Sequence, residues 1–114
     1  PEDLLSLPPS IGLINIKLAK CGGIHRAEEM AGLCLRRGIR AMVGCMSECQ
    51  ASIAAGLHFA LSSPAVVFAD LDSHLSLLDD PTRALLVREG RLLPTGTAGL
   101  GITINDRNRI MGVD

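Results

Sequence analysis

The chain has 114 residues, the size of one ordinary domain, and 47% of them are hydrophobic, which is enough for a core. The formal net charge is −1, without a long block of like charge, which argues against a nucleic-acid or membrane-surface partner. No apolar run approaches the roughly 20 residues of a membrane span. The chain starts Pro-Glu-Asp, with neither an initiator methionine nor a signal peptide, so we expect a processed or excised piece.

The four cysteines lie on or beside apolar segments, as reduced thiols of a cytoplasmic protein do. The spacing Cys45-x-x-x-Cys49 could begin a metal site, but no second ligand pair follows at a distance typical of zinc. Structural thiols are therefore the favoured interpretation of Cys21, Cys34, Cys45 and Cys49.

In chain order, acidic residues near the start favour a short helix over residues 1–5, and a strand is expected over 13–18. Apolar positions at helical spacing predict a helix over 24–37 that ends at Gly38. A strand over about 40–43, a helix over about 50–62 and a strand over 65–69 follow. This alternation predicts a parallel α/β sheet.

After Asp80-Pro81 the pattern is irregular. The apolar runs 85–87 and 91–93 flank Glu89-Gly90, which predicts a small hairpin, and a glycine-rich tail follows.

Lys17 stands out because apolar residues flank it in the first strand. A lysine there is costly unless it is paired or functional, and a desolvated lysine at the mouth of such a sheet is a candidate general base. The alternative is a lysine at a strand end whose ammonium group reaches solvent.

Asp70 and Asp72 follow the third strand and would lie on one side of an extended segment. Two neighbouring carboxylates repel each other unless a cation, either an ammonium group or a metal, lies between them. They could equally be solvated loop residues, or Asp72-Ser73 could cap a helix.

Together these segments resemble the enolase superfamily, in its muconate-lactonizing subgroup, and most closely the dipeptide epimerases of the L-Ala-D/L-Glu type. The resemblance covers nearly the whole chain. The segments that carry it are Ile14-Asn15-Ile16-Lys17-Leu18-Ala19-Lys20-Cys21-Gly22-Gly23-Ile24, Ala41-Met42-Val43-Gly44-Cys45-Met46-Ser47-Glu48, Phe68-Ala69-Asp70-Leu71-Asp72-Ser73 and Gly99-Leu100-Gly101-Ile102.

The resemblance implies an α/β fold that is the C-terminal portion, the last three βα units, of a TIM-type barrel. Such barrels need about 250 residues, so residues 1–114 would be a fragment that lacks the N-terminal part. Within it, residues 94–114 would be the tail that returns to a capping domain.

By the same resemblance, Lys17 is one of two lysines that exchange a proton at the substrate α-carbon by a two-base 1,1-proton transfer. Asp70 and Asp72 would bind the free α-ammonium of a dipeptide. The opposing lysine and the acidic ligands of Mg²⁺ would lie in the missing part, with no metal ligand in this chain. Substrate-binding roles at the barrel mouth would fall to Cys45, Met46 and Ser47. Glu48 could orient a loop instead.

The expected function is therefore part of a magnesium-dependent dipeptide epimerase, inactive as an isolated chain. The expected partners are a dipeptide, the missing part of the barrel with its capping domain, and other copies in a homo-oligomer. An N-acylamino acid racemase or a muconate cycloisomerase is the near alternative, although the pair Asp70 and Asp72 argues against both. A non-catalytic α/β module is the alternative of a different class.

Overall fold

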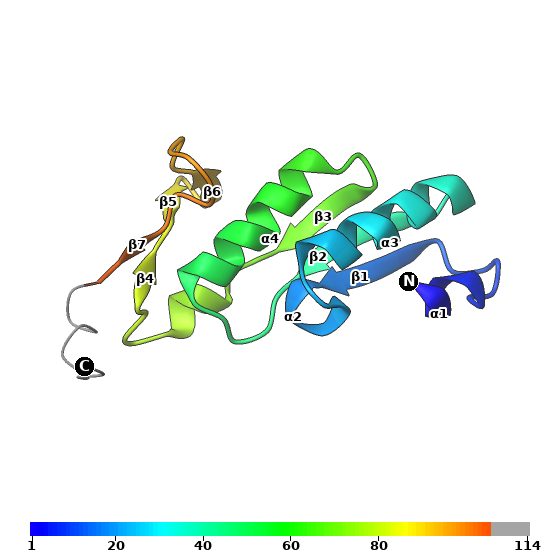
Figure 1. Ribbon diagram of the computed structural model, residues 1–114, viewed down its shortest axis with the longest axis horizontal. Helices are drawn as coiled ribbons and strands as arrows, with labels where there is room; N and C mark the ends of the chain where they lie inside the picture. Colours follow the sequence, from blue (N-terminus) through cyan, green and yellow to red (C-terminus); the bar gives the residue numbers. More distant parts are fainter. Residues whose placement is uncertain (106–114) are drawn as a thin grey trace.

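The structure is a computed structural model that describes residues 1–105. Its centre is a parallel sheet in the order β1-β2-β3, formed by Leu13–Lys17, Arg40–Gly44 and Val66–Asp70. The helices α3 (Ile24–Arg37) and α4 (Gln50–Ser62) connect successive strands, and both lie on the same face of the sheet (Figure 1). The predicted alternation of parallel strands and helices is confirmed.

The core lies between these two helices and the sheet. In α3 the buried residues are small and follow one stripe: Ala27, Ala31 and Cys34. Small residues let a helix approach a sheet closely, and the spacing of four and then three residues keeps them on one side. The larger buried side chains that fill this layer include Ile16, Val43, Ile53, Leu57 and Phe59.

Short elements complete the N-terminal part. The predicted first helix is present as α1 (Glu2–Leu5), and a helical turn, α2 (Leu18–Cys21), follows β1 directly. The sequence pattern did not predict α2, because a single turn is too short to show helical spacing. Within residues 1–105 no helix is long and apolar enough to cross a membrane.

The predicted hairpin is confirmed as β5 (Leu85–Arg88) paired with β6 (Arg91–Pro94). Glu89 and Gly90 form its turn with φ of 49° and 72°, the left-handed conformation that two-residue hairpin turns use. Two short strands that were not predicted, β4 (Thr82–Arg83) and β7 (Thr103–Ile104), pair antiparallel beside it. Of the expected tail 94–114, residues 106–114 lie outside the described residues.

Asp80 connects this C-terminal part to the start of α4. Its carboxylate accepts the backbone N–H of Gln50 at 2.7 Å and of Thr82 at 2.8 Å, and Thr82 Oγ1 accepts the N–H of Ala51 at 3.1 Å. Residues 30 positions downstream thus cap the N–H groups that the first turn of a helix cannot satisfy itself.

Burial alone would raise the pKa of Asp80. The hydrogen bonds from the backbone of Thr82 and Gln50 and from the Thr82 hydroxyl outweigh that burial, so the pKa of Asp80 is held below its usual value.

The sheet has two edges without a strand partner among residues 1–105, one at β1 and one at β3. Four of the five β3 residues are exposed, including Val67 at 44% and Phe68 at 57%. Parallel strands are normally covered on both faces and paired on both sides. The open edges and the bare face therefore offer apolar surface to another chain.

We expect the isolated chain to self-associate through this surface, with a hydrophobic dye binding to it. Phe68→Ser should shift sedimentation toward the monomer, whereas Leu78→Ser, at a fully exposed leucine outside the sheet, should not. A wild-type chain that stays monomeric at about 100 µM without binding dye would contradict this expectation.

Replacing Asp80 with alanine should lower the free energy of unfolding by about 1–2 kcal/mol, because it removes the cap of α4. Since the folded-state pKa is depressed, the carboxylate's contribution should be complete above about pH 4 and lost as the pH falls through the lower folded value.

Urea unfolding of dilute protein between about pH 3 and about pH 7 measures both effects. Asp80→Asn should keep part of the cap but flatten the pH dependence, and Asp79→Asn, at an exposed neighbouring acid, is the control. An Asp80→Asn protein with the wild-type pH dependence would refute the assignment.

Candidate active site

The carboxyl ends of the three strands form one row. Lys17 pairs with Gly44, and Gly44 pairs with Asp70, and each is the last residue of its strand. Residues paired in this way share a face of the sheet. Because strands lie about 4.8 Å apart, the backbones of Lys17 and Asp70 are about 10 Å apart across a residue without a side chain.

The row faces away from the helices. Ile16 and Val43, which precede Lys17 and Gly44, point into the core and are buried. Side chains alternate along a strand, so Lys17 and Asp70 belong to the bare face. The expectation that Lys17 and the aspartate segment share one edge of the sheet agrees with this register.

A β-bulge in β3 makes this row possible. Ala41 pairs with Val66, but Met42 pairs with Phe68, so Val67 is an extra residue without a counterpart in β2. Without it, Ala69 would lie opposite Gly44 and the Asp70 side chain would fall on the other face. The sequence pattern showed the strand but gave no sign of the bulge.

Asp72 begins a turn rather than continuing the strand. Leu71 is buried at 5% exposure, while Asp70 and Asp72 on either side of it are exposed, as the predicted alternation requires. The backbone of Asp72 then turns into a 3-10 helix, η1 (Ser73–Ser76), without a capping hydrogen bond from its side chain. Both carboxylates are therefore available to a ligand at the carboxyl end of β3.

Asn15 covers the centre of the row. A Cβ atom placed on Gly44 would lie 2.6 Å from Asn15 Oδ1 and 2.9 Å from Asn15 Nδ2. The amide of Asn15 thus occupies the space that any side chain at position 44 would need. A side chain at position 44 would therefore have to displace the Asn15 amide, which is the tip of an exposed side chain.

The loop after β2 contacts the row from one side. Lys17 Nζ donates to Met46 Sδ at 3.8 Å, the N–H of Met46 donates to Glu48 Oε1 at 2.9 Å, and the N–H of Glu48 donates to Ser73 Oγ at 3.3 Å. Of the other residues predicted there, Cys45 packs partly against the core and Ser47 is exposed. The sequence indicated only that Glu48 could orient a loop, and its hydrogen bond to Ser73 was not predicted.

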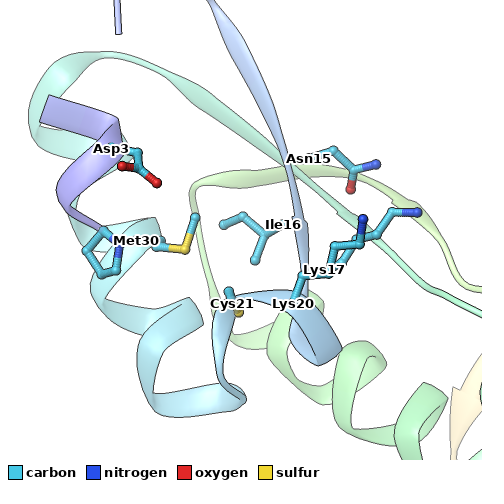
Figure 2. A pocket seen from close by; sticks show the side chains of 8 residues that line it. Asp3, Asn15, Ile16, Lys17, Lys20, Cys21 and Met30 are labelled. Carbon is cyan, nitrogen blue, oxygen red and sulfur yellow. The ribbon is translucent and has the colours of Figure 1, made fainter. Parts of the chain in front are cut away.

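A hollow of about 430 Å³ runs along the unpaired edge of β1. In Figure 2, Asn15, Lys17 and Lys20 lie on one side of the strand, and Ile16, Cys21 and Met30 on the other. The hollow is lined both by residues of the bare face and by core residues. We therefore interpret it as the uncovered edge of the sheet at β1 and not as a substrate cavity. Lys20 is exposed.

His74 is a buried polar residue that the sequence pattern did not single out. It is 7% exposed, and neither ring nitrogen has a hydrogen-bond partner among the described residues. The ring lies close enough to Asp80 to help lower the pKa of that carboxyl group.

Comparison with known proteins places these features in a family. Residues 9–108 match the family described as "Enolase C-terminal domain-like". The L-Lys-D/L-Arg epimerase of Methylococcus capsulatus is 41% identical over 110 residues, which cover 93% of this chain and 31% of that protein. The L-Ala-D/L-Glu epimerase of Bacteroides thetaiotaomicron is 39% identical over 100 residues, 88% of this chain and 25% of that protein.

Among solved structures, the dipeptide epimerase from Methylococcus capsulatus complexed with Mg and the dipeptide L-Arg-D-Lys superimposes with a TM-score of 0.85 and 42% identity. The match covers 90% of this chain and 30% of that one. The chain thus spans between a quarter and a third of the proteins it matches.

Gly44→Ala should lower the free energy of unfolding by about 1 kcal/mol or less, because the new methyl group forces the exposed Asn15 amide to move aside. Adding Asn15→Ala should recover much of that loss, giving a coupling energy of about 0.5–1 kcal/mol in a double-mutant cycle measured by urea unfolding.

Gly12→Ala is the matched control, since no atom lies within 4 Å of a Cβ at that position. A double variant no more stable than Gly44→Ala alone would show that the Asn15 side chain does not occupy this space.

Proposed function

Since the chain belongs to the enolase C-terminal domain-like family, we propose that it forms the last three βα units of a TIM-type barrel in a magnesium-dependent dipeptide epimerase. Three parallel strands in sequence order, with both connecting helices on one face, support this architecture. In such barrels the carboxyl ends of the strands carry the active site. The remaining strands and a capping domain would come from outside residues 1–114, and the tail 94–114 would return to that domain.

The observation that carries the proposal is the row formed by Lys17, Gly44 and Asp70 on the bare face of the sheet. In a barrel this face points inward. The strand ends that carry a proton-transfer group and an anionic group would then lie about 10 Å apart, with the Asn15 amide between them over Gly44. That spacing suits a substrate with an ammonium group one peptide unit away from the carbon that is inverted.

Lys17 would act on the substrate α-carbon from one side. Its Nζ would take the proton from one configuration of that carbon and return a proton to form it from the other. A single base cannot invert a carbon by this route, so the opposing base, a second lysine, must come from the part of the barrel outside this chain.

Asp70 and Asp72 would bind the α-ammonium group of the dipeptide. Both carboxylates are exposed at the end of β3, and a cation between them offsets their mutual repulsion. Hydrogen bonds to charged groups contribute about 1.5–3 kcal/mol each, enough to select substrates that carry a free ammonium. Met46, Ser47 and Cys45 would border the substrate from the loop after β2.

Within residues 1–105 no group of three histidine, cysteine or acidic residues lies close enough to hold a metal ion. The magnesium ligands would come from strands outside this chain. The residues of this chain would contribute binding, orientation and proton transfer. The four free thiols suit a cytoplasmic enzyme, and we expect it to form a homo-oligomer.

The test is exchange of the substrate α-proton in deuterated water by the complete natural protein that contains this chain. Lys17→Ala should abolish α-proton exchange in one configuration of the dipeptide, while the opposing base still exchanges the α-proton of the other configuration. The rate of epimerisation should fall by about 10²–10⁴-fold. Lys20→Ala, at an exposed lysine three residues away, is the control.

Asp70→Asn and Asp72→Asn should each lower kcat/KM for free dipeptides by about 10–100-fold. The 114-residue chain alone should exchange no α-proton. Equal activity on N-acetylated dipeptides would favour an N-acylamino acid racemase, and turnover of muconate a cycloisomerase. A complete protein without any of these activities would favour the non-catalytic module.

A further inference from the structure

The loop from Cys45 to Cys49 contacts both Lys17 and the segment that follows Asp72. It leaves the end of β2 at the centre of the row and leads into α4. On one side Met46 Sδ accepts from Lys17 Nζ, and on the other the N–H of Glu48 donates to Ser73 Oγ, next to Asp72. Within the described residues, this loop therefore connects the lysine with the aspartate segment.

Glu48 holds the loop together internally. Its Oε1 atom accepts the N–H of Met46 at 2.9 Å, two residues back in the chain. The acceptor is a carboxylate and the donor a backbone N–H, and such a hydrogen bond is stronger than one between two neutral groups. It holds the backbone of Met46 in place. It therefore also helps to position Met46 Sδ, which accepts a hydrogen bond from the Lys17 ammonium group.

The two hydrogen bonds of Glu48 link Met46 to Ser73 through one residue. Its carboxylate sets the position of Met46, and its backbone N–H sets the position of Glu48 relative to Ser73. The bond to Ser73 is partly buried and the bond from Met46 is exposed, so solvent competes less for the first than for the second. The carboxylate binds the backbone of its own loop, as expected of a side chain that orders the loop and does not bind substrate itself.

We infer that Glu48 is a positioning residue that sets the spacing between the Lys17 ammonium and the Asp70–Asp72 carboxylates. This inference rests on the proposed function. A dipeptide places its α-ammonium one peptide unit from the carbon to be inverted, so a fixed spacing selects α-aminoacyl dipeptides over β-aminoacyl ones, which are longer by one methylene. Glu48 would thus control the length of the substrate that the site accepts.

The experiment compares Glu48→Ala, Glu48→Gln and wild type in the complete protein, using an α-aminoacyl dipeptide and its β-alanyl analogue. Glu48→Ala should lower kcat/KM for the α-dipeptide by about tenfold, and should lower the preference over the β-alanyl analogue. Glu48→Gln keeps an acceptor oxygen and should recover both to within about threefold. Glu28→Ala, at an exposed glutamate on α3, is the control.

Hydrogen exchange of the Met46 amide gives a readout that does not need activity. Exchange should be about tenfold faster or more in Glu48→Ala and near the wild-type rate in Glu48→Gln. If wild type epimerises no dipeptide while this amide behaves as expected, the proposed function fails and the structural role of Glu48 stands. An unchanged substrate preference in Glu48→Ala, or equal losses in the Ala and Gln variants, would overturn the inference.

Discussion

The register between β2 and β3 is the constraint on which the candidate site depends. One extra residue, Val67, shifts the pairing between the two strands. That shift turns Asp70 onto the face that also carries Lys17, because a one-residue slip moves a side chain to the opposite face. A bulge next to a functional residue is a common way to redirect a side chain. The chemistry proposed for this chain thus rests on a backbone irregularity rather than on an added loop.

Packing places a polar group at the centre of that row. The Asn15 amide lies over Gly44, so the middle of the row is lined by an amide rather than by an apolar side chain. The loop after β2 then leads directly into α4, whose first turn is capped from a distance by Asp80. Stability at the start of α4 and order in the loop are therefore coupled, since a frayed first turn would release the residues that precede it.

Much of the fold could be predicted from the sequence, because α3 is long and amphipathic and α4 is a long apolar segment rich in alanine and leucine. Gly38 marked the end of α3, and Glu89-Gly90 marked the hairpin turn. The position of Lys17 and Asp70 at strand ends also followed from local pattern. The bulge at Val67 did not, because register depends on contacts between strands.

The hydrogen-bonded links could not be predicted either. Glu48 contacts Ser73 across 25 positions, and Asp80 contacts Gln50 across 30. Such pairs leave no periodic signal in a single chain, since each partner is an ordinary polar residue in its own surroundings. Sequence analysis could name Glu48 as a residue that orients a loop, but only the structure identifies the backbone groups that it binds.

The most direct test of the account is a crystal structure of the complete protein with a bound, unreactive dipeptide analogue. The α-ammonium of the analogue should lie within about 3 Å of the Asp70 and Asp72 carboxylates. Lys17 Nζ should lie about 3–3.5 Å from the second residue's α-carbon, on one face of it. A dipeptide bound with its ammonium away from these carboxylates, or with Lys17 directed away from the α-carbon, would contradict it.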